Sequence, residues 1–277
     1  MAINDISLTS AMRSNLLALQ NTASLLDQTQ TRLSTGKKVN NPIDNAINYF
    51  LAKSFNDQAS DLTISKDNMA TAIQTISAAN NGVKAISALI DSAKAIATSA
   101  KSSSVTTDIT NYATQFTSIM AQIDNIAGTG NDAAFNGTNL LKGDVLNVDL
   151  GSGSSLTVTG FNAATAGPTL TIGTSGAWAL GTTGATAIDT SITNLTTATT
   201  TLRAQTQNLS ANLGIVQTRQ TFASDMINTL QKGADNLTLA DMNEEGANML
   251  ALQTRQSLGI TSLSLASQAN QSILKLF

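Results

Sequence analysis

The segment QANQSILKLF (residues 268–277) carries large apolar side chains in a region with almost no charge. From Gly246 onward the only charged residues are Arg255 and Lys275. Two apolar stripes at helical spacing run along this region, one through Ala251, Leu258 and Leu265 and the other through Ile260, Leu263, Ile273 and Leu274. A helix that is apolar on several faces is a buried helix. We therefore expect a helix from about residue 247 that needs cover on more than one side.

The beginning of the sequence has the same character. Residues 1–31 contain only three charged residues, and apolar residues three or four apart predict a helix. This first stripe consists of Met12, Leu16, Leu19, Ala23, Leu26 and Leu33. The segment RLSTGKKVNNPID (32–44) then interrupts the rhythm. Gly36 is expected to follow the last helical residue, and Pro42 is expected to open a new helix.

Three more helices are predicted between the two ends. Apolar spacing resumes at Ile43 and continues without a proline to Lys101, which corresponds to a helix of roughly 85 Å. Similar stripes cover residues 109–126 and 188–230. A helix this long is typical of a bundle or coiled coil rather than of an ordinary globular domain.

The middle of the chain differs in composition. Residues 128–184 contain 12 of the 18 glycines. Asn136-Gly137 between apolar residues predicts a hairpin turn, and VLNVDL (145–150) and SLTVTG (155–160) alternate as strands do. The predicted fold is mainly α, a long antiparallel helical bundle or coiled coil built from both chain ends, with a small β-rich central insert. We expect a terminal core domain (1–40 with 235–277), a bundle domain (41–139 with 188–234) and a surface-exposed insert (140–187).

Composition excludes most chemistry. The chain has no Cys and no His, and 12% of its residues are charged, compared with about 25% in an average protein. Thiol nucleophiles, imidazole bases and the common transition-metal ligands are therefore missing. Glu244 and Glu245 are adjacent and point to different sides of a helix, so they are interpreted as favourable charges in its first turn, with Asp241 and Asn243 as candidate caps. We predict no enzyme activity, no cofactor, no metal and, with a net charge of -3, no nucleic-acid partner.

Membrane insertion is not expected either. No apolar stretch reaches the ~18 residues that a membrane helix needs. The start, MAINDISLTS, has neither the basic nor the apolar region of a cleaved secretory signal, so export would use another route. Asn136-Gly137-Thr138 fits an N-glycosylation sequon but fits a hairpin turn better.

The two apolar ends are predicted to act in self-assembly. Two helices of about 30 residues form at most a two-stranded pair, which buries too little apolar surface to offset the entropy of ordering both segments. We therefore expect the ends to be disordered in the monomer and to fold against other copies of the chain. The predicted assembly residues are Leu16, Leu19, Leu26, Leu33, Leu258, Leu263, Leu265, Ile273, Leu274, Leu276 and Phe277.

Several segments resemble bacterial flagellin. RLSTGKKVNNPIDNA (32–46) is similar to the family's Arg-Leu-Ser-Ser-Gly motif and the acidic segment after it. The helix before it, LGIVQTRQTFA (213–223) and SLASQANQSILKLF (264–277) also match family segments. The resemblance covers roughly 1–140 and 188–277, and its motif residues are Arg32, Leu33, Ser34, Gly36, Asn40 and Asp44.

The resemblance implies a structural subunit of the extracellular flagellar filament, with paired termini lining a central channel. It also implies export through the flagellar type III apparatus, an export chaperone on the C-terminal arm, assembly under a cap, and contact with hook-associated proteins. A hook–filament junction protein is the nearest alternative. A secreted membrane-disrupting helical protein is a further one, although the apolar ends lack basic faces.

The sequence departs from the family pattern in two places. Pro42, Asn45, Ile47, Tyr49 and Phe50 replace the residues usual there, so local packing is expected to differ. Ser92 and Ala95 align with the Arg and Glu that innate immune receptors recognise in many flagellins. We therefore predict weak recognition by such a receptor.

Overall fold

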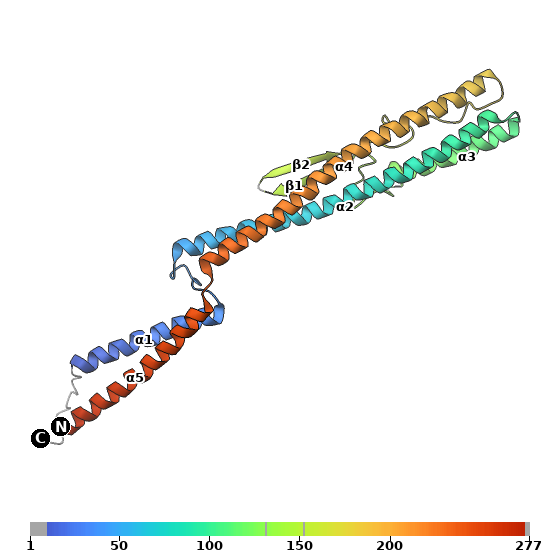
Figure 1. Ribbon diagram of the computed structural model, residues 1–277. Coiled ribbons are helices and arrows are strands. Elements are labelled where there is room, and N and C mark those ends of the chain that lie inside the picture. Colours follow the sequence, from blue (N-terminus) through green and yellow to red (C-terminus); the bar gives the residue numbers. More distant parts are fainter. Residues whose placement is uncertain (1–9, 131, 152, 275–277) are drawn as a thin grey trace, which may run out of the picture. The chain divides into compact units, whose positions relative to one another are not determined.

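The computed structural model describes residues 10–130, 132–151 and 153–274, without the side chains of Thr129, Asn270, Ile273 and Leu274. The expected contacts of Ile273, Leu274, Leu276 and Phe277 lie outside this part of the chain. The described residues form five α-helices, a short π-helix (Asn125–Thr129) and a two-stranded antiparallel sheet, so the mainly α prediction is confirmed (Figure 1). The elements are α1 (Ser10–Thr35), α2 (Ala46–Ser102), α3 (Thr106–Asp124), β1 (Val145–Gly151), β2 (Ser154–Thr159), α4 (Thr182–Thr238) and α5 (Met242–Leu274).

The chain divides into two compact units. The first, here called the terminal unit, consists of Met1–Gln58 and Thr229–Phe277, and the second, the central unit, is Ala59–Asn228. Both boundaries fall inside the long helices α2 and α4, which have 57 residues each. Each unit is described separately below.

The central unit has a continuous core with a seven-residue repeat. On α2 a buried residue recurs at every seventh position, and α4 has a matching series. The two series are Leu62, Met69, Ile76, Val83, Ile90 and Ala97 on α2, and Ile188, Leu195, Leu202, Leu209, Val216 and Ala223 on α4. A repeat of seven keeps one seam facing its partner when helices supercoil. Phe116 and Ile123 of α3 complete this core.

The β-rich segment packs against the helices of the central unit. Trp178 packs on Phe116 with ring centroids 4.8 Å apart, and its indole N–H donates to the hydroxyl of Ser191 on α4. Gly82 lies deep in α2, where an added Cβ would be 2.5 Å from Leu141 Cδ1. The segment therefore lies against the bundle and contributes its own buried residues to the core.

The two predicted strands and the predicted Asn136-Gly137 turn are confirmed. Val145 to Gly151 pairs with Ser154 to Thr159 in antiparallel register. Phe135 and Thr138 exchange two backbone hydrogen bonds of 3.0 Å around Asn136 and Gly137, whose φ angles are +48° and +78°. Two positive φ angles in a two-residue loop are typical of the turn that Asn-Gly favours.

The prediction for the start of α2 was wrong. Pro42 lies in a turn, and α2 begins at Ala46. The Asp44 carboxylate accepts hydrogen bonds from the backbone N–H groups of Asn40 and Asn41, which holds this segment in a turn. The Asn45 side chain then accepts the N–H of Asn48 and caps the helix.

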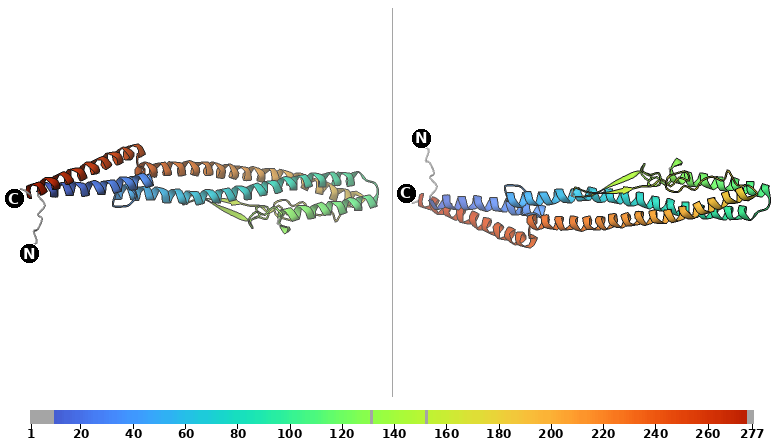
Figure 2. Two further views of the ribbon diagram at one scale, coloured as in Figure 1. Left: turned by 90° about the horizontal axis from the view of Figure 1, so that it is seen from below. Right: turned by 90° about the horizontal axis from the view of Figure 1, so that it is seen from above.

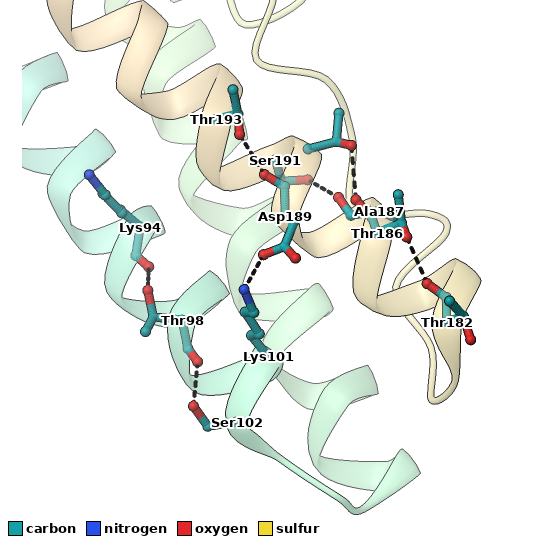
Figure 3. A network of polar contacts seen from close by, with 11 residues as sticks. Lys94, Thr98, Lys101, Ser102, Thr182, Thr186, Ala187, Asp189, Ser191 and Thr193 are labelled. Atoms are coloured by element: carbon teal, nitrogen blue, oxygen red, sulfur yellow. Dashed lines mark hydrogen bonds and ion pairs between the residues drawn. The ribbon is translucent and has the colours of Figure 1, made fainter.

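The start of α4 also differs from the prediction, because α4 begins at Thr182, before the apolar stripe at Ile188. Its first turns are rich in threonine and lack the apolar spacing that would predict a helix. The hydroxyls of Thr186 and Thr193 donate to carbonyls of their own helix, and Asp189 pairs with Lys101 of α2 (Figure 3). The Lys101 Nζ–Asp189 Oδ1 distance is 2.5 Å. The threonine hydroxyls are thus hydrogen-bonded within the helix. The ion pair to α2 helps to hold this polar first part of α4 in place.

Candidate assembly surface

The terminal unit is built around the pair α1 and α5. The two helices lie side by side and run antiparallel (Figures 1 and 2). Gly259 allows a close approach, since a Cβ there would lie 3.0 Å from Leu19 Cγ. Only Thr29 is buried in α1, all of which is described. A two-helix pair covers just one side of each helix, so most of the apolar surface remains open.

The predicted assembly residues fall into two groups. Leu19, Leu26, Leu33 and Leu263 are half-buried, whereas Leu16, Leu258 and Leu265 are exposed. The exposed fractions of Leu258 and Leu265 are 63% and 68%, which is unusual for leucine on a helix that already has a partner. The structure therefore separates residues near the helix pair from residues left without cover.

The exposed leucines form an outer face on α5. Leu258 and Leu265 are seven residues apart, so they point within about 20° of each other around the helix. The buried Leu252 lies on the other side of α5. Leu250 extends this apolar surface and is exposed, whereas the exposed Ile260 lies on a different side of α5. We call Leu250, Leu258 and Leu265 the α5 outer face.

An open apolar groove of about 380 Å³ lies between α1 and α5. Its lining consists of Met12, Leu16, Ile260, Leu263, Ser264 and Ser267. The methionine, leucine and isoleucine side chains make the lining mostly apolar, and the two serines add polar groups. Ile260 is two residues from Leu258 and points about 160° away from it around the helix, so the groove and the α5 outer face are separate apolar areas on different sides of α5.

Several exposed apolar residues were missed by the sequence reasoning. Leu17 and Leu25 of α1 are exposed next to the predicted Leu16 and Leu26. The signal was present in the apolar pairs Leu16-Leu17 and Leu25-Leu26, but only one member of each pair fits a single stripe. Because the prediction followed a single stripe, it missed the second apolar face of α1.

The start of α2 contributes a second apolar area, the α2 patch, formed by Ile43, Ile47, Phe50 and Leu51. All four side chains are exposed, with Ile43 at 96%. Ile47, Phe50 and Leu51 are spaced so that they share one helical face. Ile47 and Phe50 are among the departures from the flagellin pattern, so two of these departures lie in the exposed α2 patch.

Residues of the Arg-Leu-Ser-Thr-Gly segment join the end of α1 to the start of α5. Arg32 donates to the buried Glu245 carboxylate at 3.0 Å, and Gly36, with a φ of +70°, follows the last residue of α1 as predicted. The backbone N–H of Lys38 donates to the carbonyl of Thr238. Of the other motif residues, Leu33 is half-buried and Ser34 exposed.

The acidic residues near α5 behave differently from one another. Asp241 accepts hydrogen bonds from the N–H groups of Asn243 and Glu244 and so caps α5, as predicted. Asn243 lies inside the first turn, so its prediction as a cap was wrong. Glu245 reaches back to Arg32, so its contribution goes beyond the favourable first-turn charge that was expected.

Asp44 and Asn40 form the polar centre of the connecting segment. Hydrogen bonds from the backbone N–H groups of Asn41 and Asn40 hold the pKa of the Asp44 carboxyl below its usual value. The Asn40 side chain donates to the carbonyl of Lys37. These contacts shape the backbone between α1 and α2, which is a structural role.

Ser92 and Ala95 lie exposed on α2 in the central unit. The Ser92 hydroxyl donates to the Ala88 carbonyl of its own helix, and Ala95 has no polar group. Neither residue offers the charge that receptor recognition would use, and weak recognition stays a prediction.

The described residues contain no group of three acidic residues that could hold a metal ion. A search of the same residues finds no helix that is long and apolar enough to span a membrane. The described residues instead form long helices, and the terminal pair of helices carries uncovered apolar faces. These features define a class of helical structural proteins.

Comparison with known proteins identifies the family. Residues 3–145 match the bacterial flagellin N-terminal helical region, and residues 185–277 match the bacterial flagellin C-terminal helical region. Flagellins FljM and FljO of Caulobacter vibrioides are 32% and 31% identical, each over the whole of both chains. A flagellin of Brucella melitensis is 30% identical, with 95% of this chain and 96% of the relative covered. The chain belongs to the bacterial flagellins.

Family membership settles the general role. The protein is a structural subunit that polymerises into the extracellular flagellar filament used for motility. The alternatives of a hook–filament junction protein and a membrane-disrupting protein gain no support from these matches.

Proposed function

We propose that this flagellin assembles through coupled folding of α1 and α5, whose uncovered apolar faces are buried by neighbouring subunits. The observation that supports this most is the α5 outer face, where Leu258 and Leu265 are largely exposed although α5 is already paired with α1. Fully burying one such leucine contributes about 1.5–3 kcal/mol. A regular polymer repeats this gain at every subunit, while the monomer exposes the same surface to water.

The assembly residues of the proposal are those predicted from the sequence together with Leu250 and Ile260. The half-buried Leu19, Leu26, Leu33 and Leu263 would fix the α1–α5 pair, and the exposed Leu16, Leu258 and Leu265 would contact other copies. Ile273, Leu274, Leu276 and Phe277 extend the same apolar segment and are proposed to join the shared core.

We propose the same three-part organisation that the composition predicts. Residues 1–40 with 235–277 would form the inner core of the filament, 41–139 with 188–234 the surrounding bundle, and 140–187 the outer surface. The glycine-rich, polar composition of the middle segment supports its place facing solvent.

Further partners are proposed from the family. Hook-associated and cap proteins would contact the chain during assembly, and a flagellar export chaperone would cover the apolar C-terminal arm before passage through the type III apparatus. The chain is proposed to act without catalysis or a cofactor, which the lack of His and Cys supports.

Elongation of filament seeds tests the proposal. A chain lacking residues 268–277 should fail to elongate seeds, as seen by electron microscopy. Val145→Ser is the matched control, because Val145 is exposed on β1 in the segment proposed to face solvent. The control should elongate as the full chain does. Normal elongation by the truncated chain would refute the role given to the C-terminal segment.

A further inference from the structure

The chain contains the dipeptide Asn-Gly twice, in two different backbone settings. Asn81-Gly82 lies inside α2, and Asn136-Gly137 forms the two-residue turn between Phe135 and Thr138. Both asparagine side chains are exposed to solvent. The two sites therefore have the same local sequence and similar access to water, and differ in how the backbone is held.

Asn-Gly can change spontaneously through its own backbone. The amide nitrogen of the glycine attacks Cγ of the asparagine, a new C–N bond forms, and the side-chain nitrogen leaves as ammonia. Water then opens the five-membered succinimide ring at either carbonyl and gives aspartate or isoaspartate. The net reaction consumes one water and releases one ammonia. Glycine favours the attack because no Cβ shields its nitrogen, but the backbone must first rotate to bring that nitrogen onto Cγ.

The helical setting blocks this rotation at Asn81-Gly82. The residues are far from both ends of α2, so the N–H of Gly82 belongs to the regular hydrogen bonding of the helix. Gly82 is buried, and an added Cβ there would be 2.5 Å from Leu141 Cδ1 and 2.9 Å from Ala133 Cβ. Rotating this peptide would break the helix at a buried and closely packed position.

The turn leaves Asn136-Gly137 much freer. The hydrogen bonds that close the turn join Phe135 and Thr138, so they leave out the peptide group between Asn136 and Gly137. Asn136 has a φ of +48°, a region that residues other than glycine rarely adopt. Gly137 is exposed, and a Cβ built on it would meet no atom within 4 Å. Opening this turn costs two hydrogen bonds at the surface and disturbs no packed side chain at Gly137.

We propose that Asn136 is a site of spontaneous deamidation in this flagellin, with water as the co-reactant, and that Asn81 is protected by its helix. The product carries a new negative charge. Asn136 lines a hollow of about 400 Å³ together with Asp149, Asn68 and Thr71, so the new carboxylate shares that hollow with an existing one. Isoaspartate also lengthens the main chain within a turn of two residues. The modification therefore loosens the hairpin on both electrostatic and geometric grounds.

Mass spectrometry on the intact, full-length protein tests the proposal. Samples are taken over time in mildly alkaline buffer and digested with trypsin at Lys66, Lys84, Lys101 and Lys142, which places Asn81 and Asn136 on separate peptides. In the folded protein Asn136 should convert at least about tenfold faster than Asn81, since a helix interior opens far less often than a surface turn. In strong denaturant both sites should convert at similar rates, which shows that the fold causes the difference.

Two variants complete the experiment. Asn136→Gln should remove the fast conversion, and Asn81→Gln should leave it unchanged. Equal rates at the two sites in the folded protein would overturn the proposal. Persistence of intact Asn136 in the folded protein, under conditions in which it converts in denaturant, would also overturn it, as would a glycan on Asn136. Filament assembly does not enter the measurement, so this result is independent of the function proposed above.

Discussion

The terminal and central units use apolar residues in opposite ways. Among the described residues, 13 of the 20 large apolar side chains that are exposed belong to the terminal unit, whereas 35 of the 39 buried apolar residues belong to the central unit. The central unit arranges its apolar residues on one seam per helix, and the terminal unit spreads them over several faces. The central unit is thus complete within one chain, while the terminal unit presents apolar surface for which one chain has no cover.

The largest expected effect of a single substitution on the monomer lies in the central seam. Ile76→Ala removes a fully buried side chain from α2 and should cost about 2–5 kcal/mol in the free energy of unfolding. Thermal and denaturant unfolding of the monomer would measure it. Leu258→Ala in the α5 outer face is the matched control and should change monomer stability by no more than about 0.5 kcal/mol. Equal losses would contradict the division between the two units.

The α5 outer face should give the reverse pattern when assembly is measured. Leu258→Ser should weaken each subunit's addition to the filament by about 1.5–3 kcal/mol, which raises the critical concentration at least tenfold. Sedimentation of polymer over a range of subunit concentrations gives this value. Ile64→Ser, a similarly exposed residue of the central unit, tests whether any exposed apolar residue has the same effect. A critical concentration unchanged by Leu258→Ser would exclude this face from the interface.

Regular apolar spacing made most of the fold predictable from sequence. The long helices, the turn at Gly36 and the Asn136-Gly137 hairpin each follow a strong local rule, and the structure confirms them. The polar start of α4 could not be predicted in the same way, because its threonines satisfy their hydroxyls within the helix and leave no periodic signal. Pro42 was misplaced because Asp44 and Asn45 form a turn and a cap that override the preference of proline for a first helical position.

The assembly surface was predictable in kind but not in extent. Apolar spacing in the sequence identified Leu258 and Leu265 as assembly residues. Leu250 and Leu17 fit neither predicted stripe, so their exposure could be recognised only once the position of the partner helix was known. The Arg32–Glu245 pair was also beyond the sequence, because 213 residues separate its members. Long-range polar pairs depend on the tertiary fold and have no local pattern.

Arg32 offers a smaller test, within the terminal unit itself. Arg32→Ala leaves the buried Glu245 carboxylate without its partner. The substitution should lower the stability of the terminal unit by about 1–2 kcal/mol. This value is smaller than for a fully buried ion pair because Arg32 is partly exposed. The loss should appear in assembled filaments as lower hydrogen-exchange protection where α1 and α5 meet. Arg32→Ala combined with Glu245→Gln should recover part of it, since the uncompensated charge is then removed. No recovery in the double variant would mean that the arginine acts through packing alone.

The smallest expected effect concerns Asp44, at the connection between α1 and α2. Because the pKa of its carboxyl is lowered by hydrogen bonds from Asn41 and Asn40, the ionised form stabilises the fold. This contribution is fully present above the ordinary carboxyl pKa and is lost as the pH falls through the lowered value. An NMR titration should therefore show the amide protons of Asn40 and Asn41 shifting together in acid, at a pH below the ordinary carboxyl pKa. In Asp44→Asn the shift should disappear, while the long helices keep their circular dichroism signal. A titration of both amides at the ordinary carboxyl pKa would show that Asp44 is not held by these hydrogen bonds, and the turn that displaces Pro42 from the helix would then need another cause.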